Sequence, residues 1–168
     1  MRYWIAAVFI VAGAAFWAHN NTYAGKTAPD FSLTTVNGDR VKLSDQRGKV
    51  VVLDFWATWC GPCRASLPHL QQASENEAWA DRGLVVWAVN DQQSADDVSR
   101  FVNGNGYTFT ALIDSEGSAI SKYGVRGIPM TVIVGRDGKV RNVFVGWGDE
   151  SGREIDEAIE KALSESVS

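Results

Sequence analysis

Almost unbroken hydrophobic positions fill residues 50–56, with the sequence Val-Val-Val-Leu-Asp-Phe-Trp, and a Cys-Gly-Pro-Cys segment follows at residues 60–63. A run of this composition is typical of a central strand that is covered on both faces. Gly61 and Pro62 favour a bend followed by the backbone conformation of a first helical turn. The pattern therefore predicts a buried strand that leads directly into a two-cysteine turn at the start of a helix.

Shorter runs predict the remaining strands of the chain. Residues 31–35 and 40–43 alternate apolar and polar positions on either side of Asn37-Gly38, a dipeptide typical of tight hairpin turns. Apolar runs predict further strands at residues 83–90, 109–113, 130–134 and 140–145. The last two are joined by Arg-Asp-Gly-Lys, so we expect them to form a second hairpin.

Apolar positions spaced by three and four residues predict the helices. The first is expected to begin near Gly61, to continue into the seventies and to bend at Pro68, where the ring removes a hydrogen bond. Ser94 is expected to cap a second helix, and two more are expected at residues 118–123 and 150–166. This order of elements predicts an α/β fold, in which a mixed central sheet has helices on both faces and an N-terminal β-hairpin extension.

An apolar run at residues 3–18 follows the single cation Arg2. As a helix it would span about 24 Å, which is shorter than the roughly 30 Å hydrocarbon core of a bilayer. This length favours a cleavable signal over a membrane tether, with a buried core helix as a weaker alternative. We therefore predict a signal peptide or N-terminal membrane anchor at residues 1–24 and one domain at residues 25–168, which we expect to be monomeric.

Composition and charge narrow the class of protein. The chain has 168 residues, of which 45% are hydrophobic, and this length suits one domain with a substantial core. Its 16 basic and 20 acidic residues give a net charge of -4, so no basic surface for nucleic acid is expected. The chain has two cysteines, Cys60 and Cys63, and a disulfide across so small a loop gains little stability. Redox chemistry explains this pair better than a structural staple does.

The position of the cysteines suggests their roles. Cys60 at a helix N-terminus faces unpaired N–H groups and the positive end of the helix dipole, which stabilise a thiolate. We expect Cys60 to attack a partner disulfide and Cys63 to resolve the mixed disulfide. Trp56 and Trp59 are expected to form apolar walls for a bound peptide, while Pro62 stiffens the turn.

Two further polar side chains have competing interpretations. Asp54 interrupts the apolar strand, so burial would raise its pKa, although contacts at a strand end could also satisfy the carboxylate. His69 is more simply a surface histidine than a metal ligand, because the chain offers two cysteines and a distant His19 where zinc requires four convergent ligands. No metal or other cofactor is expected.

The segment from Asp54 through Cys63, together with Gly127-Ile128-Pro129, resembles the thioredoxin superfamily. The opening residues 28–33, the hairpin and residues 134–139 are similar to its exported TlpA/ResA/DsbE branch of thiol-disulfide oxidoreductases. The resemblance covers residues 26–165 and implies a thioredoxin-like fold.

The resemblance also implies roles for individual residues. Ile128-Pro129 is implied to be a cis peptide that faces the cysteines, with the Ile128 backbone pairing with substrate, and Asp54 is implied to accept a proton from Cys63. Two features depart from the family. Ser66 stands where this branch commonly has a glutamate, and residues 84–90 lack the lysine that partners the buried acid in cytosolic thioredoxins.

The sequence as a whole predicts a protein-disulfide reductase that acts on exported proteins, for example in cytochrome c maturation. The Gly61-Pro62 dipeptide matches reducing thioredoxins, so electrons are expected from an upstream membrane thiol transporter. Two alternatives stay open. One is a thiol peroxidase, although Leu53 and Ala57 replace the Pro and Thr of peroxiredoxins. The other is a non-enzymatic copper chaperone on a similar fold.

Overall fold

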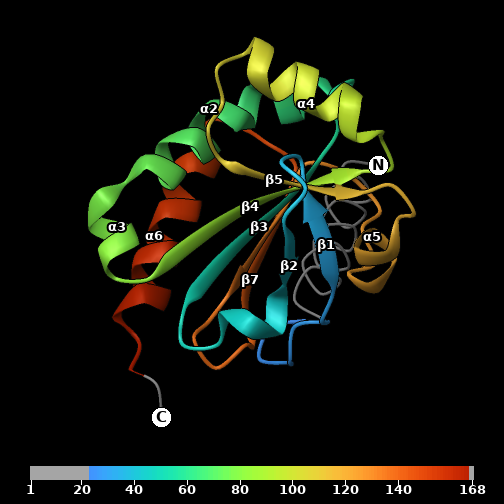
Figure 1. The fold of residues 1–168 in the computed structure, drawn as a ribbon. Helices are drawn as coiled ribbons and strands as arrows, with labels where there is room; N and C mark the ends of the chain where they lie inside the picture. Colours follow the sequence, from blue (N-terminus) through green and yellow to red (C-terminus); the bar gives the residue numbers. More distant parts are fainter. Residues whose placement is uncertain (1–22, 167–168) are drawn as a thin grey trace, which may run out of the picture.

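The computed structural model describes residues 23–166, in which seven strands form one sheet with the order β2-β1-β5-β4-β3-β6-β7 (Figure 1). Strands β3, β4 and β5 run parallel, and the other neighbouring pairs are antiparallel. The prediction of a mixed sheet with an N-terminal hairpin, β1–β2, at one edge is confirmed. The strands are β1 Ser32–Thr35, β2 Arg40–Lys42, β3 Val50–Trp56, β4 Leu84–Asp91, β5 Thr110–Asp114, β6 Met130–Val134 and β7 Val140–Val145.

Helices cover both faces of this sheet (Figure 1). One apolar cluster joins residues of α2, α3, α4 and α6 to the sheet, and a second joins α5 and the segment around β1 to the opposite face. The helices are η1 Leu43–Gln46, a 3₁₀ turn, and α2 Gly61–Glu75, α3 Glu77–Asp81, α4 Ala95–Gly104, α5 Ser118–Lys122 and α6 Ser151–Ser164. The short α3 was not predicted. Asn76 caps this helix, and the helix places Trp79 in the core.

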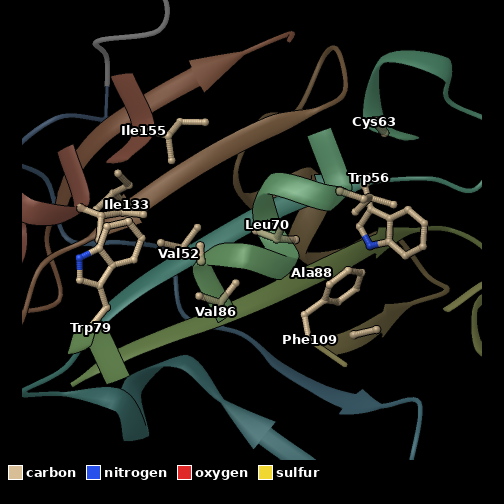
Figure 2. Packing of buried hydrophobic residues seen from close by; sticks show 14 of the residues in the cluster. Val52, Trp56, Cys63, Leu70, Trp79, Val86, Ala88, Phe109, Ile133 and Ile155 are labelled. Carbon is tan, nitrogen blue, oxygen red and sulfur yellow. The ribbon is translucent and has the colours of Figure 1, made fainter. Parts of the chain in front are cut away.

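Strand β3 lies between β4 and β6 and is buried along its whole length. Its alternating side chains divide between the two clusters. Val52 and Trp56 pack on the α2 side (Figure 2), and Leu53 and Phe55 pack on the other side. By the same alternation, Asp54 points toward α2. The acid therefore lies beneath the helix that carries both cysteines.

The predicted leader at residues 1–24 lies almost entirely outside the described residues, as does His19. Within residues 23–166, no helix has the length and apolar character needed to cross a membrane.

Candidate active site

The two cysteines lie where β3 passes into α2. Cys60 is the N-cap of α2 and is joined by a disulfide to Cys63 in the first turn, with 5.2 Å between the two Cα atoms. The Cys63 backbone N–H donates a hydrogen bond to Cys60 Sγ at 3.2 Å. Cys60 is 5% exposed and Cys63 is fully buried, so Cys60 is the more accessible of the two cysteines. A backbone donor at a helix N-terminus favours negative charge on Cys60.

The loop before β6 brings a distant part of the chain to this disulfide. Ile128-Pro129 is a cis peptide, as the resemblance implied, and Pro129 is buried. The Ile128 carbonyl oxygen lies 3.7 Å from Cys60 Sγ. Two motifs that are separated by more than sixty residues therefore share one site.

The apolar surface at the site is made by Trp59, and not by Trp56. Trp59 is 69% exposed, and Pro62 beside it is also exposed. Trp56 is fully buried beside Phe109, with 6.4 Å between the ring centroids (Figure 2). Its ring centroid also lies 5.4 Å from that of Phe101. The expectation that Trp56 forms a peptide-binding wall is wrong, because strand alternation turns this side chain into the core.

A side chain from the loop after β4 holds the turn that leads to the cysteines. The Thr58 backbone N–H donates to Gln93 Oε1 at 2.8 Å, and Gln93 Nε2 donates to Thr58 Oγ1 at the same distance. Buried Asn90 Nδ2 donates to Gln93 Oε1 at 3.1 Å. Sequence reasoning missed Gln93. Its position just after β4 could have indicated this role, because β4 is parallel to β3 and both strands end at the same edge of the sheet.

Asp54 is 2% exposed, and its carboxyl group has one hydrogen-bond partner among the described residues. Thr131 Oγ1 donates to Asp54 Oδ1 at 2.7 Å, and Oδ2 is buried without a partner. Burial raises the pKa of Asp54 to about 7, against the lowering effect of the Thr131 hydrogen bond. The carboxyl group therefore changes protonation state near neutral pH. Sequence reasoning missed the role of Thr131, because its contact with Asp54 depends on the register in which β6 pairs with β3.

The structure corrects the expectation that His69 is an ordinary surface histidine. Its side chain is 18% exposed, and its Nε2 lies 2.9 Å from Asp156 Oδ1 on α6. Its ring also packs against Trp147, with 5.4 Å between the centroids. Across residues 23–166, no group of three or more His, Cys, Asp or Glu side chains converges as a metal site.

The sheet has the thioredoxin-like arrangement, and the Cys-Gly-Pro-Cys segment at the start of α2 lies beside the loop that holds the cis proline. These features together define the class of thioredoxin-like thiol-disulfide oxidoreductases. The chain belongs to the AhpC/TSA family, whose family model matches residues 24–143.

Individual relatives agree with this assignment. The chain is 34% identical over 143 residues to the thiol-disulfide oxidoreductase ResA of Geobacillus thermodenitrificans, covering 84% of this chain and 81% of the relative. It superimposes on a putative thiol:disulfide interchange protein DsbE from Chlorobium tepidum with a TM-score of 0.78 and 38% identity, covering 84% and 98% of the two chains.

A third match is the exposed lipoprotein thioredoxin of Streptococcus pneumoniae, with a TM-score of 0.69 and 30% identity over 79% of this chain and 99% of that one. The predicted fold and family resemblance are confirmed, and the protein is an oxidoreductase enzyme.

Proposed function

We propose that this thiol-disulfide oxidoreductase reduces disulfide bonds of exported proteins through a Cys60/Cys63 dithiol. The placement of Cys60 carries the proposal. Its sulfur lies at the start of α2 and accepts a hydrogen bond from the Cys63 backbone N–H, and Cys60 is the more accessible of the two cysteines. Reactive cysteines occupy this kind of position because the helix N-terminus stabilises the thiolate.

The reaction proceeds in two exchanges. The Cys60 thiolate attacks one sulfur of the substrate disulfide, and the other substrate sulfur leaves as a thiolate that takes a proton from solvent. Cys63 then gives its thiol proton to the Asp54 carboxylate and attacks Cys60 Sγ. The bond between Cys60 and the substrate breaks, which releases the second substrate thiolate and leaves the enzyme disulfide.

Substrate binding is assigned to the surface around the disulfide. Exposed Trp59 and Pro62 offer an apolar ledge, and the backbone of Ile128 offers hydrogen-bonding groups to an extended chain, while buried Pro129 supports the loop behind it. A protein segment with a strained or exposed disulfide fits this open surface.

The direction of electron flow is assigned from the Gly61-Pro62 dipeptide, which matches reducing thioredoxins. We expect a reduction potential near that of thioredoxin, about -270 mV, and far from the about -120 mV of a strong oxidant. A reductase outside the cytosol needs electrons from across the membrane, so a membrane thiol transporter or reductase is the proposed upstream partner.

The proposed location is extracytoplasmic, with residues 1–24 as a signal peptide or as an inner-membrane anchor through residues 3–18, and residues 25–168 as a monomeric catalytic domain. The apolar leader supports this location, and a similar structure is that of an exposed lipoprotein. Fractionation of cells that express the full chain tests the location, and light scattering tests the oligomeric state.

A trapping experiment tests the proposed function. The Cys63→Ser variant should stall as a mixed disulfide between Cys60 and its protein substrate, for example an apocytochrome c, which mass spectrometry identifies. The matched Cys60→Ser variant should trap nothing. Absence of any adduct in Cys63→Ser, while Cys60 remains open to alkylation, would contradict the proposal.

Two assays separate the alternatives. The wild-type protein should accelerate the reduction of insulin disulfides by dithiothreitol. Peroxide consumption that outpaces disulfide reduction would favour a thiol peroxidase, and stoichiometric copper on the reduced protein without insulin reduction would favour a metal chaperone.

A further inference from the structure

A small pocket lies between β3, β6, α2 and α6, on the α2 side of the sheet. Its polar lining consists of buried Asp54, Ser66, His69 and Thr131, and its remaining walls are mainly apolar. The sheet contributes Asp54 and Thr131, and α2 contributes Ser66 and His69. The two titratable side chains of the lining are therefore the buried carboxyl group and the histidine.

The pocket is the right size and polarity for a single water molecule. Its volume of about 10 Å³ is close to the smallest cavity that holds one water, and a buried water needs two to four polar partners. Asp54 Oδ2 is buried without a hydrogen-bond partner among the described residues. The Ser66 hydroxyl donates to the Cys63 carbonyl oxygen at 2.9 Å, which leaves its own oxygen free to accept a hydrogen bond. A water bound here would supply a hydrogen bond to the unpaired carboxyl oxygen of Asp54.

His69 lies at the boundary between this pocket and solvent. Its ring is held by Asp156 of α6 at 2.9 Å and by contact with Trp147, which also lines the pocket. Asp156 is itself 45% exposed. An imidazole that is oriented by a carboxylate and touches both a buried cavity and the surface is well suited to move protons.

We propose that His69, oriented by Asp156, exchanges the proton of Asp54 with solvent through this pocket. The inference rests on the proposed function, because it supplies the proton movements of that reaction. When Cys63 resolves the mixed disulfide, its thiol proton moves to Asp54, and then through pocket water to His69 and out to solvent. When a dithiol reductant attacks Cys60 in the enzyme disulfide, the bond to Cys63 breaks and Cys63 leaves as a thiolate. That thiolate takes a proton from Asp54, which receives it through His69.

The groups that surround this route are few. Asp54 comes from β3, His69 from α2 and Asp156 from α6, while β6 and the segment after β7 contribute the uncharged Thr131 and Trp147. His69 touches neither sulfur in this scheme, so it acts through Asp54 and is a positioning residue for its proton.

Proton exchange can be measured on the oxidised protein without any substrate. A pH jump across neutrality changes the protonation of Asp54, which the infrared C=O stretch of a protonated carboxyl group reports; the band is assigned by its loss in Asp54→Asn. We expect His69→Gln to slow this relaxation by about 100-fold, the lower range for a positioned proton-transfer group. Glutamine can still donate a hydrogen bond to Asp156, which preserves the contact between α2 and α6. Added imidazole should restore part of the rate.

Glu160→Gln provides the matched control. Glu160 is another carboxylate of α6 that contacts a neighbouring segment, through Arg82 Nη1 at 2.7 Å, but it does not line the pocket. This variant should relax at the wild-type rate. Wild-type relaxation in folded His69→Gln, or equal slowing in Glu160→Gln, would overturn the inference. Neither result depends on whether the protein reduces insulin, so the inference and the proposed function fail separately.

Discussion

The two faces of β3 are equally buried but chemically different. On one face, Leu53 and Phe55 pack into an apolar cluster with Tyr123, whose buried hydroxyl has no hydrogen-bond partner among the described residues and whose pKa is raised further by burial. On the other face, Asp54 lies beneath α2 with one carboxyl oxygen unpaired. A strand selected only for stability would carry an apolar residue at position 54, since a buried carboxylate is costly.

This contrast distinguishes residues of β3 that stabilise the sheet from the residue that can transfer a proton. The β3 side chains that face α5 are all apolar, whereas the face toward α2 carries a buried carboxyl group, which costs stability. Residues whose pKa is displaced by burial near a reactive group are candidates for proton transfer. The difference between the faces can therefore be tested by substituting each in turn.

The largest effect is expected for Asp54→Asn, which removes the titratable group from the α2 face. The wild-type pKa of about 7 lies above the unfolded value of 3.8, so the native state binds the proton more tightly and wild-type stability falls as pH rises from 4 to 7. The variant should lack this fall. Relative to the wild type, its free energy of unfolding should increase by on the order of 4 kcal/mol between pH 4 and pH 8.

The same variant should resolve mixed disulfides about 100-fold more slowly, the lower range for loss of a proton acceptor. Urea unfolding across this pH range and single-turnover insulin reduction measure the two effects. Parallel stability curves for the variant and the wild type would show that Asp54 does not titrate as the structure indicates.

Phe55→Ala tests the opposite face of the strand. Phe55 is fully buried, with its ring centroid 5.2 Å from that of Tyr123. We expect a loss of about 3–5 kcal/mol in the free energy of unfolding, from lost burial and the cavity that remains. The pH dependence of insulin reduction by the folded variant should stay as in the wild type. A displaced pH profile would mean that the two faces are not functionally separate.

Thr131→Val removes the hydrogen bond to Asp54 and keeps the side-chain shape. Because that bond lowers the pKa of Asp54, its loss should raise the pKa further and shift the activity profile to higher pH. Activity at pH 6, below the pKa of Asp54, should fall roughly fivefold, which corresponds to a hydrogen bond worth about 1 kcal/mol. Thr131→Ser, which retains the hydroxyl, is the control and should keep the wild-type profile.

The smallest effect is expected for Gln93→Leu. This variant removes the side chain that holds the turn at Thr58, before the cysteines, and leaves Asp54 unchanged. Loss of its bonds to Thr58 should let Trp59 and Cys60 move, which should raise the KM for insulin by about threefold, within the usual range for one net hydrogen bond. The exposed Gln72→Leu on α2 controls for the loss of a surface amide. An unchanged KM would assign Gln93 a purely structural role.

Local patterns in the sequence were sufficient to predict most of the elements. The strands at residues 50–56, 130–134 and 140–145 have the predicted bounds, and Ser94 caps α4 as expected. These features depend on side-chain alternation and turn chemistry within a few residues, which the sequence displays directly. The helix α3 was missed because five residues are too few for a periodic pattern.

The cysteines and the buried acid were also predicted from the sequence, because a Cys-x-x-Cys pair and a lone carboxylate in an apolar strand are local signals. The surroundings of these residues were not. Thr131 meets Asp54 only because β6 pairs with β3 in one register, and Gln93 reaches Thr58 only because β4 ends beside β3. His69 was assigned to the surface but is largely buried against Asp156 and Trp147. Trp56 was assigned to a wall of the substrate site but lies in the core, so both assignments were wrong.

The sequence by itself therefore determined the strand, the turn and the reactive groups, since each depends on neighbouring residues along the chain. The tertiary structure alone decided which side chains surround Asp54 and the disulfide. Those contacts join residues that are dozens of positions apart, and they depend on strand order, register and helix packing, which local periodicity does not encode.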